Sequence, residues 1–100
     1  MQTVNLSASD VLNHLNLEVP ASWTTKAGEL DVVCVNTPEM ELGWLVTLNM
    51  NLFKGNSFTV HEFASDKEFG NDHESDDEFL TYDEALTHIR NRVEHFKGDI

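Results

Sequence analysis

The sequence is poor in cysteine, proline, basic residues and long apolar runs. It holds one cysteine and two prolines in 100 residues. The single Cys34 cannot form an internal disulfide, which fits a reducing compartment. No apolar run approaches the roughly 18 residues that a membrane-spanning helix needs, and the N-terminal residues lack the basic start and apolar stretch of a secretion signal. We therefore expect a cytoplasmic protein, or one made in a host cytoplasm, with no membrane contact.

The shortage of positive charge is the strongest compositional feature. Six Lys and Arg stand against 18 Asp and Glu, giving a formal net charge of −12. Phosphates would be repelled by this excess, so direct binding to nucleic acid or to an anionic membrane is not expected. The same excess attracts basic protein surfaces and also keeps a small protein soluble. Composition alone leaves both interpretations open.

Motifs that support chemistry are also missing. We find no activated nucleophile with a histidine base and no glycine-rich phosphate loop. A calcium loop requires glycine at its sixth position, and loops that start at Asp66 or Asp72 have Asn71 or Asp77 there. A zinc site needs several closely spaced Cys or His. The acidic residues 66–78 contain one histidine, His73, and no cysteine. The sequence predicts a protein that is not an enzyme and has no cofactor or metal site.

Local patterns predict one helix and three strands in the first two thirds of the chain. Residues 7–17 have a serine that can cap a helix, followed by apolar residues at helical spacing. Residues 29–36 are rich in β-branched side chains, as strands are. Residues 44–53 alternate apolar and polar side chains, and a Lys-Gly-Asn-Ser turn joins them to a return strand at residues 58–63. We expect these last two strands to form a hairpin.

A second helix is predicted at the C-terminus. Thr81 and Glu84 form a T-x-x-E capping box. Apolar residues follow at helical spacing: Tyr82, Ala85, Leu86, Ile89, Val93 and Phe96. His88, Arg92 and His95 share another face of this helix. We interpret that face as the solvated side, with a polar or pH-sensitive contact patch as the alternative.

These elements predict a single α+β domain spanning residues 1–100. Its three-stranded, mostly antiparallel sheet would have the N-terminal and C-terminal helices packed on one face, in the order α-β-β-β-α. Residues 66–78 lie between the hairpin and the last helix. Gly70 and Asn71 lie within them and β-branched residues are nearly missing, so we expect an acidic loop there.

Clustered carboxylates in this loop support the functional hypothesis. Half of the acidic residues fall between Asp66 and Glu84. Asp83 and Glu84 have a structural reason for their position, because negative charge is favourable at a helix N-terminus. The other seven have no structural role that the sequence indicates. We predict that these seven bind a partner: Asp66, Glu68, Asp72, Glu74, Asp76, Asp77 and Glu78.

We expect a small inhibitor or modulator that docks on a basic protein. Nucleic-acid-binding proteins and nucleases are partners of this kind, because carboxylates can occupy the positions where they bind phosphates. Such a DNA mimic would resemble phage or mobile-element inhibitors and antitoxins in its action. The alternative is an adaptor or homo-oligomeric domain that uses an exposed apolar sheet face lined by Leu45, Phe53 and Phe63. The acidity would then serve solubility only, and both a monomer and a homodimer remain open.

Overall fold

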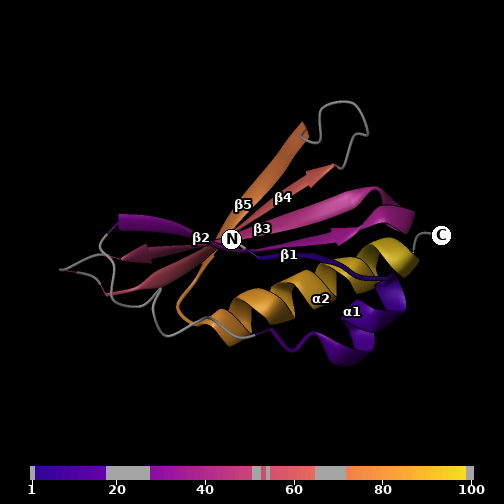
Figure 1. The fold of residues 1–100 in the computed structure, drawn as a ribbon, viewed down its shortest axis with the longest axis horizontal. Coiled ribbons are helices and arrows are strands. Elements are labelled where there is room, and N and C mark those ends of the chain that lie inside the picture. Colours follow the sequence, from indigo (N-terminus) through magenta and orange to yellow (C-terminus); the bar gives the residue numbers. More distant parts are fainter. Residues whose placement is uncertain (1, 18–27, 51–52, 54, 65–71, 99–100) are drawn as a thin grey trace.

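Within the residues that the computed structural model of the chain describes, two helices cover one face of a five-stranded sheet (Figure 1). The structure describes residues 2–17, 28–50, 53, 55–64 and 72–98. In chain order the elements are β1 (Gln2–Asn5), α1 (Ala8–His14), β2 (Gly28–Thr37), the 3-10 turn η2 (Pro38–Met40), β3 (Leu42–Met50), β4 (Ser57–Ala64), β5 (Asp72–Phe79) and α2 (Tyr82–Gly98).

The strands lie in the sheet in the order in which they occur in the chain. β1 runs parallel to β2, with Val4 opposite Val35. The chain passes through α1 between these two strands, as parallel neighbours need a crossover connection. The pairs β2–β3, β3–β4 and β4–β5 are all antiparallel. The sheet is therefore mixed, with β1 at one edge and β5 at the other.

The predicted three-stranded, mostly antiparallel sheet is wrong, although the α+β class holds. β1 has only four residues, too few to give a periodic signal. β5 occupies Asp72–Phe79, where we predicted part of an acidic loop. Its sequence has few residues that favour strands, but it pairs with β4 from Phe58–Phe79 to Ala64–Asp72. This pairing outweighs the low local propensity. The remainder of the predicted loop, residues 66–71, lies outside the described residues.

The apolar core lies between the sheet and the two helices. The β3 residues Trp44, Val46 and Leu48 are at most 1% exposed, as their alternation in the sequence predicts. The buried residues of the core come from every described layer: Ala8, Val11, Val32, Val33, Val35, Trp44, Val46, Leu48, Val60, Ala85, Leu86, Ile89 and Val93. Burial of each large side chain contributes about 1.5–3 kcal/mol. Within the part of the chain that the structure describes, no helix is long and apolar enough to cross a membrane.

Both helices begin where their capping residues predict. The Ser7 hydroxyl accepts from the Asp10 backbone N–H at 3.1 Å, and the Asp10 carboxylate accepts from the Ser7 N–H at 3.3 Å. The Thr81 hydroxyl accepts from the Glu84 N–H and donates to the Glu84 carboxylate, both at 3.1 Å. α1 ends at His14, so it is shorter than the predicted segment 7–17.

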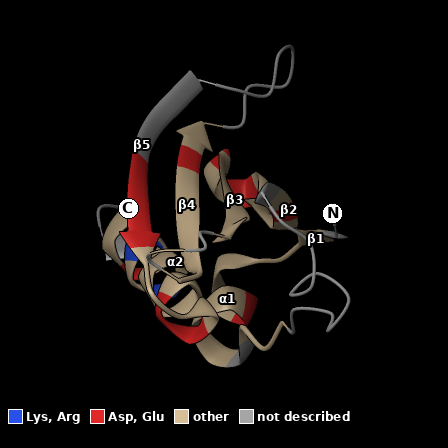
Figure 2. Cartoon of the chain, turned by 90° about the vertical axis from the view of Figure 1, so that its left-hand side faces the viewer, with Lys and Arg blue, Asp and Glu red and all other residues tan. Residues whose placement is uncertain are grey.

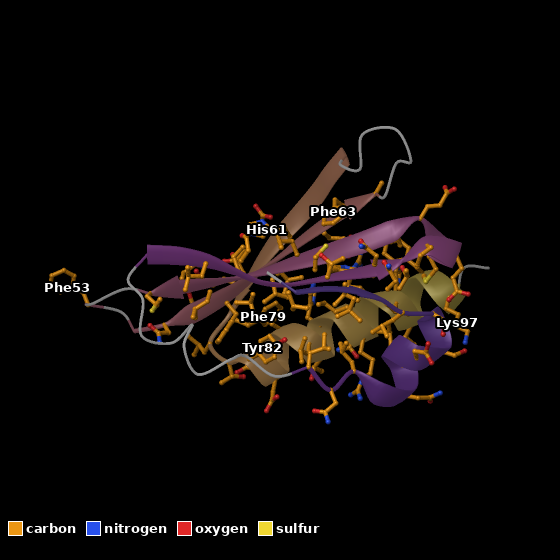
Figure 3. All side chains as sticks on the ribbon, viewed as in Figure 1. Phe53, His61, Phe63, Phe79, Tyr82 and Lys97 are labelled. Atoms are coloured by element: carbon orange, nitrogen blue, oxygen red, sulfur yellow. The ribbon has the colours of Figure 1, made fainter. Side chains whose placement is uncertain are left out.

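The described elements leave the second face of the sheet open, because α1 and α2 both lie on the first (Figure 1). Phe63 points from β4 onto this open face (Figure 3) and packs over Gly43 of β3. A Cβ atom at Gly43 would lie 2.6 Å from Phe63 Cε2 and 2.8 Å from Asn36 Oδ1. Gly43 therefore allows the ring to approach the sheet closely, and a side chain at this position would displace it.

Candidate protein-binding surface

The edge strand β5 presents three successive carboxylates. Among the described strands it pairs with β4 alone, and Figure 2 shows its acidic part at one side of the sheet, beside α2. Side chains alternate along a strand. Contacts with side chains of β4 place Asp76 and Glu78 on the open face, and a contact with α2 places Asp77 on the helix side. Asp83 and Glu84 follow in the first turn of α2. We call these five residues the acidic edge.

Asp76 is bound by a histidine from the neighbouring strand. The His61 Nδ1 atom lies 2.6 Å from Asp76 Oδ1, and the His61 Nε2 atom lies 3.2 Å from Thr47 Oγ1. A neutral ring that donates from Nδ1 to Asp76 can accept from Thr47 at Nε2. The side chains of His61 and Asp76 are 26% and 48% exposed. This chain of contacts crosses three strands on the open face.

Hydroxyl, imidazole and carboxylate follow one another here in the order of a nucleophilic triad. Thr47 is 1% exposed, so a substrate cannot reach its hydroxyl. We conclude that Thr47 positions His61 against Asp76. The half-buried Cys34 lies on the same face, and burial, with a smaller effect of the Asp31 charge, raises the pKa of its thiol. The reactive thiolate of Cys34 is therefore disfavoured.

Asp77 is bound by a histidine of α2. The His88 Nε2 atom lies 3.2 Å from Asp77 Oδ2, and the two side chains are 22% and 48% exposed. The His88 ring also packs against Phe79, with 4.9 Å between the ring centroids. Glu78 accepts a hydrogen bond of 3.2 Å from the Ser57 hydroxyl. Asp76 and Glu78 therefore each have a hydrogen-bond partner within the chain, and Asp77 has a close contact with an imidazole nitrogen. All three side chains remain accessible to solvent.

Glu62 of β4 is a buried carboxylate on the helix-covered side of the sheet. Its side chain is 4% exposed. Trp44 Nε1 donates to it at 2.9 Å, and Arg92 donates from Nε and Nη2 at 2.8 and 3.0 Å. Burial alone would raise the pKa of Glu62, but the hydrogen bonds from Arg92 and Trp44 and the charges of Arg92 and His88 lower it overall. Glu62 therefore remains ionised and ties α2 to the sheet.

A surface groove lies where β5 meets α2. Its volume is about 350 Å³. It is lined by Phe79, Asp83, Glu84, Thr87, His88 and Asn91. The five lining residues that belong to α2 are linked by spacings of three or four positions and so share one face of the helix. Figure 3 shows Phe79 between the sheet and α2. A smaller hollow of about 140 Å³ shares Asp83 and Thr87 with the groove and is also lined by Leu15, Leu86 and Arg90.

The structure brings together part of the predicted partner-binding set. Asp76, Asp77 and Glu78 lie on one exposed strand. Asp72 and Glu74 belong to the same strand, but their side chains are outside the described set, as are Asp66 and Glu68 entirely. Our interpretation that these carboxylates have no structural role is wrong for the three described ones, because each binds a neighbouring strand or α2.

The partners of these carboxylates were not predicted from the sequence. His61 occupies a polar position of the predicted hairpin, but its neighbour Asp76 was assigned to a loop. The face of α2 that holds His88, Arg92 and His95 was interpreted as solvated, and this is correct for the exposed His95 only. His88 and Arg92 are only 22% and 33% exposed. The position of His88 and Arg92 at helical spacing, next to the apolar stripe of α2, was the sequence signal that could have predicted these contacts.

Among the described residues, no group of three or more His, Cys, Asp or Glu side chains could hold a metal ion. Comparison with protein-family models, curated proteins and solved structures gives no match to this chain. Its function is therefore inferred from the geometry and charge of its own surface.

Proposed function

We propose that the chain is a small, non-enzymatic binding protein whose acidic edge docks on a basic protein, as an inhibitor or modulator. The alignment of Asp76, Asp77 and Glu78 on an exposed edge strand is the main support. Their side chains alternate between the two faces, so the rim of the sheet presents negative charge on both sides. Asp83 and Glu84 extend this charge onto α2.

The histidine contacts are compatible with docking. Each imidazole contacts one oxygen of its carboxylate, and a carboxylate can accept several hydrogen bonds. Asp76 and Asp77 are therefore held in fixed positions, and both are still about half exposed. Charged groups that are already ordered lose less side-chain entropy on binding. A rigid, anionic rim of this kind is suited to the Lys and Arg side chains that contact phosphates in a nucleic-acid-binding protein or a nuclease.

Affinity capture with a matched control tests this proposal. The chain is immobilised and exposed to a lysate of its native host in low and in high salt, together with two variants of equal net charge. The first variant, Asp76→Asn/Asp77→Asn/Glu78→Gln, removes the three successive negative charges at the end of β5. The second variant neutralises exposed carboxylates on other elements: Asp31→Asn/Glu41→Gln/Glu94→Gln. Denaturation in urea establishes that both variants are folded.

We expect a basic protein that binds the wild-type chain and the second variant in low salt, is released in high salt, and does not bind the first variant. Capture of the same protein by both variants would contradict the proposal. Capture that does not change with salt would also contradict it.

The open face of the sheet supports a second candidate function, a homo-oligomeric or adaptor domain. Leu45 and Phe63 are half-buried on this face. Phe53, which we expected beside them, is 97% exposed and lies at the far end of the hairpin (Figure 3). Measurement of the molecular mass by light scattering in low and high salt separates the candidates. A dimer that persists in high salt favours an apolar interface on the open face.

A further inference from the structure

The groove between β5 and α2 is lined by aromatic, polar and acidic side chains. Phe79 and the half-buried His88, whose ring packs on Phe79, form one side. Exposed polar residues of α2, including Thr87 and Asn91, form another. The groove therefore combines an aromatic surface with polar and charged groups, at the point where the two elements of the acidic edge meet.

The charge of the groove favours a cation as its occupant. Asp83 and Glu84 both line it. Glu84 accepts one hydrogen bond from Thr81, and a carboxylate can accept several. Asp77 contacts His88, which also lines the groove. A phosphate group, or the acidic edge of a second copy of this chain, would be repelled from this position.

The aromatic side of the groove favours arginine over lysine. A guanidinium is planar and weakly hydrated, stacks on aromatic rings and offers five N–H donors to nearby oxygens. An ammonium group is a compact, strongly hydrated charge and gains less from such a surface. The chain itself shows the preferred contact on the next turns of α2, where the Arg92 guanidinium lies 4.7 Å from the centroid of the Phe96 ring.

We propose that the groove lined by Phe79, Asp83, Glu84, Thr87, His88 and Asn91 receives one arginine side chain of the basic partner. This inference rests on the proposed function and narrows its partner to a protein that presents an exposed arginine beside further basic residues. The groove supplies specificity, and the β5 carboxylates supply longer-range attraction.

Peptide titrations followed by NMR on the isotope-labelled full chain test the inference. The probes are three short capped peptides in which glycine alternates with arginine, lysine or citrulline; citrulline keeps the shape of arginine without its charge. We expect the arginine peptide to shift the amide signals of Phe79, Thr87, His88 and Asn91. The lysine peptide should bind about 2–5-fold more weakly, the range of a surface cation–π contact. The citrulline peptide should leave these signals unchanged.

Variants of the full chain localise the binding. Thr87→Arg places a guanidinium of the chain's own in the groove at an exposed helix position, and Asp31→Asn gives the same change in net charge on distant β2. We expect Thr87→Arg to weaken binding of the arginine peptide by about tenfold or more, and Asp31→Asn to leave the affinity nearly unchanged. Equal effects of the two variants, or equal affinities for arginine and lysine peptides, would overturn the groove inference.

The outcomes also separate this inference from the proposed function. The arginine and lysine peptides could bind with equal affinity, with binding lost only in the variant Asp76→Asn/Asp77→Asn/Glu78→Gln. That result would support the acidic edge as a docking surface and would show that the arginine site is wrong. If neither the arginine nor the lysine peptide binds, and the captured partner binds this triple variant as well as it binds the wild-type chain, the groove inference and the proposed function are both wrong.

Discussion

Glu62 and Asp77 extend from neighbouring strands toward the same helix, yet their environments differ. The Glu62 side chain is 4% exposed and receives hydrogen bonds from Arg92 and Trp44. The Asp77 side chain is 48% exposed and contacts His88. The buried carboxylate is held by a guanidinium that is always charged, and the exposed one by an imidazole. The first arrangement fixes the fold, and the second leaves a charged surface for other molecules.

The two carboxylates should differ in how much stability is lost when the partner of each is removed. Removing one partner of a buried ion pair leaves an uncompensated charge in a poorly solvated site, which is strongly destabilising. Removing one partner of a half-exposed pair costs little, because water solvates the group that remains.

The largest effect is expected for Arg92→Met, which preserves much of the side-chain volume and removes the charge. Glu62 would keep the Trp44 hydrogen bond and lose both hydrogen bonds from Arg92. We expect a loss of about 3 kcal/mol in the free energy of unfolding, at the low end for a buried pair because Arg92 is partly exposed. Urea denaturation measures it. The double variant Glu62→Gln/Arg92→Met should recover part of the loss, and a double variant as unstable as the single one would contradict the explanation.

The pH dependence of stability tests the same site with no change in shape. The pKa of Glu62 is lowered in the folded chain, so its stabilising contribution is complete above the unfolded pKa of about 4.3 and is lost as the pH falls through the lower folded value. We expect Glu62→Gln to reduce the loss of stability on acidification. Urea denaturation of both chains between neutral pH and about pH 3 measures the difference. Parallel stability curves would show that Glu62 makes no such contribution.

The helices and the hairpin could be predicted because their signals are local. The Ser7 and Thr81 caps lie within one turn of the residues they bind. The alternation around Trp44 and Val46 belongs to a single strand, and the sheet buries the expected side of it. These features depend on neighbours in the sequence, and the hydrophobic effect then selects the buried face.

β1, β5 and the carboxylate partners could not be predicted, because long-range pairing determines them. β5 has a composition typical of a loop, and its strand geometry follows from the backbone groups of β4 that need partners. The parallel pairing of β1 depends on how α1 is placed. Glu62 and Arg92 lie 30 positions apart, and no local pattern connects them. The carboxylates of the candidate surface can therefore be read from the sequence, but their strand geometry and their contacts within the chain cannot.

Tyr82 provides a spectroscopic test of the helix-covered side. Burial, with a smaller effect from Asp83, raises the pKa of Tyr82 to about 12, and its hydroxyl is buried with no hydrogen-bond partner among the described residues. Because this is the single tyrosine of the chain, phenolate absorbance reports on it alone. We expect a midpoint near 12 in the folded chain and near the ordinary value of about 10 in urea. Its contribution to stability is present below about pH 10 and is lost as the pH rises toward the folded value.

A midpoint close to 10 in the folded chain would mean that solvent reaches the Tyr82 hydroxyl, and the packing at the start of α2 would need revision. Asp83→Asn is the matched variant. It removes the smaller cause of the shift, so the pKa should fall slightly and still remain above that of the unfolded chain.

The smallest effect is expected for Asp77→Asn, at the acidic edge. Asparagine can still hydrogen-bond His88, and water can solvate both half-exposed side chains. We expect the free energy of unfolding to change by less than about 1 kcal/mol, clearly less than for Arg92→Met in the same buffer. A loss as large as that of Arg92→Met would mean that Asp77 is a structural carboxylate like Glu62. The negative charge of β5 would then be explained by folding alone, and the case for a docking surface would rest on Asp76, Glu78 and the start of α2.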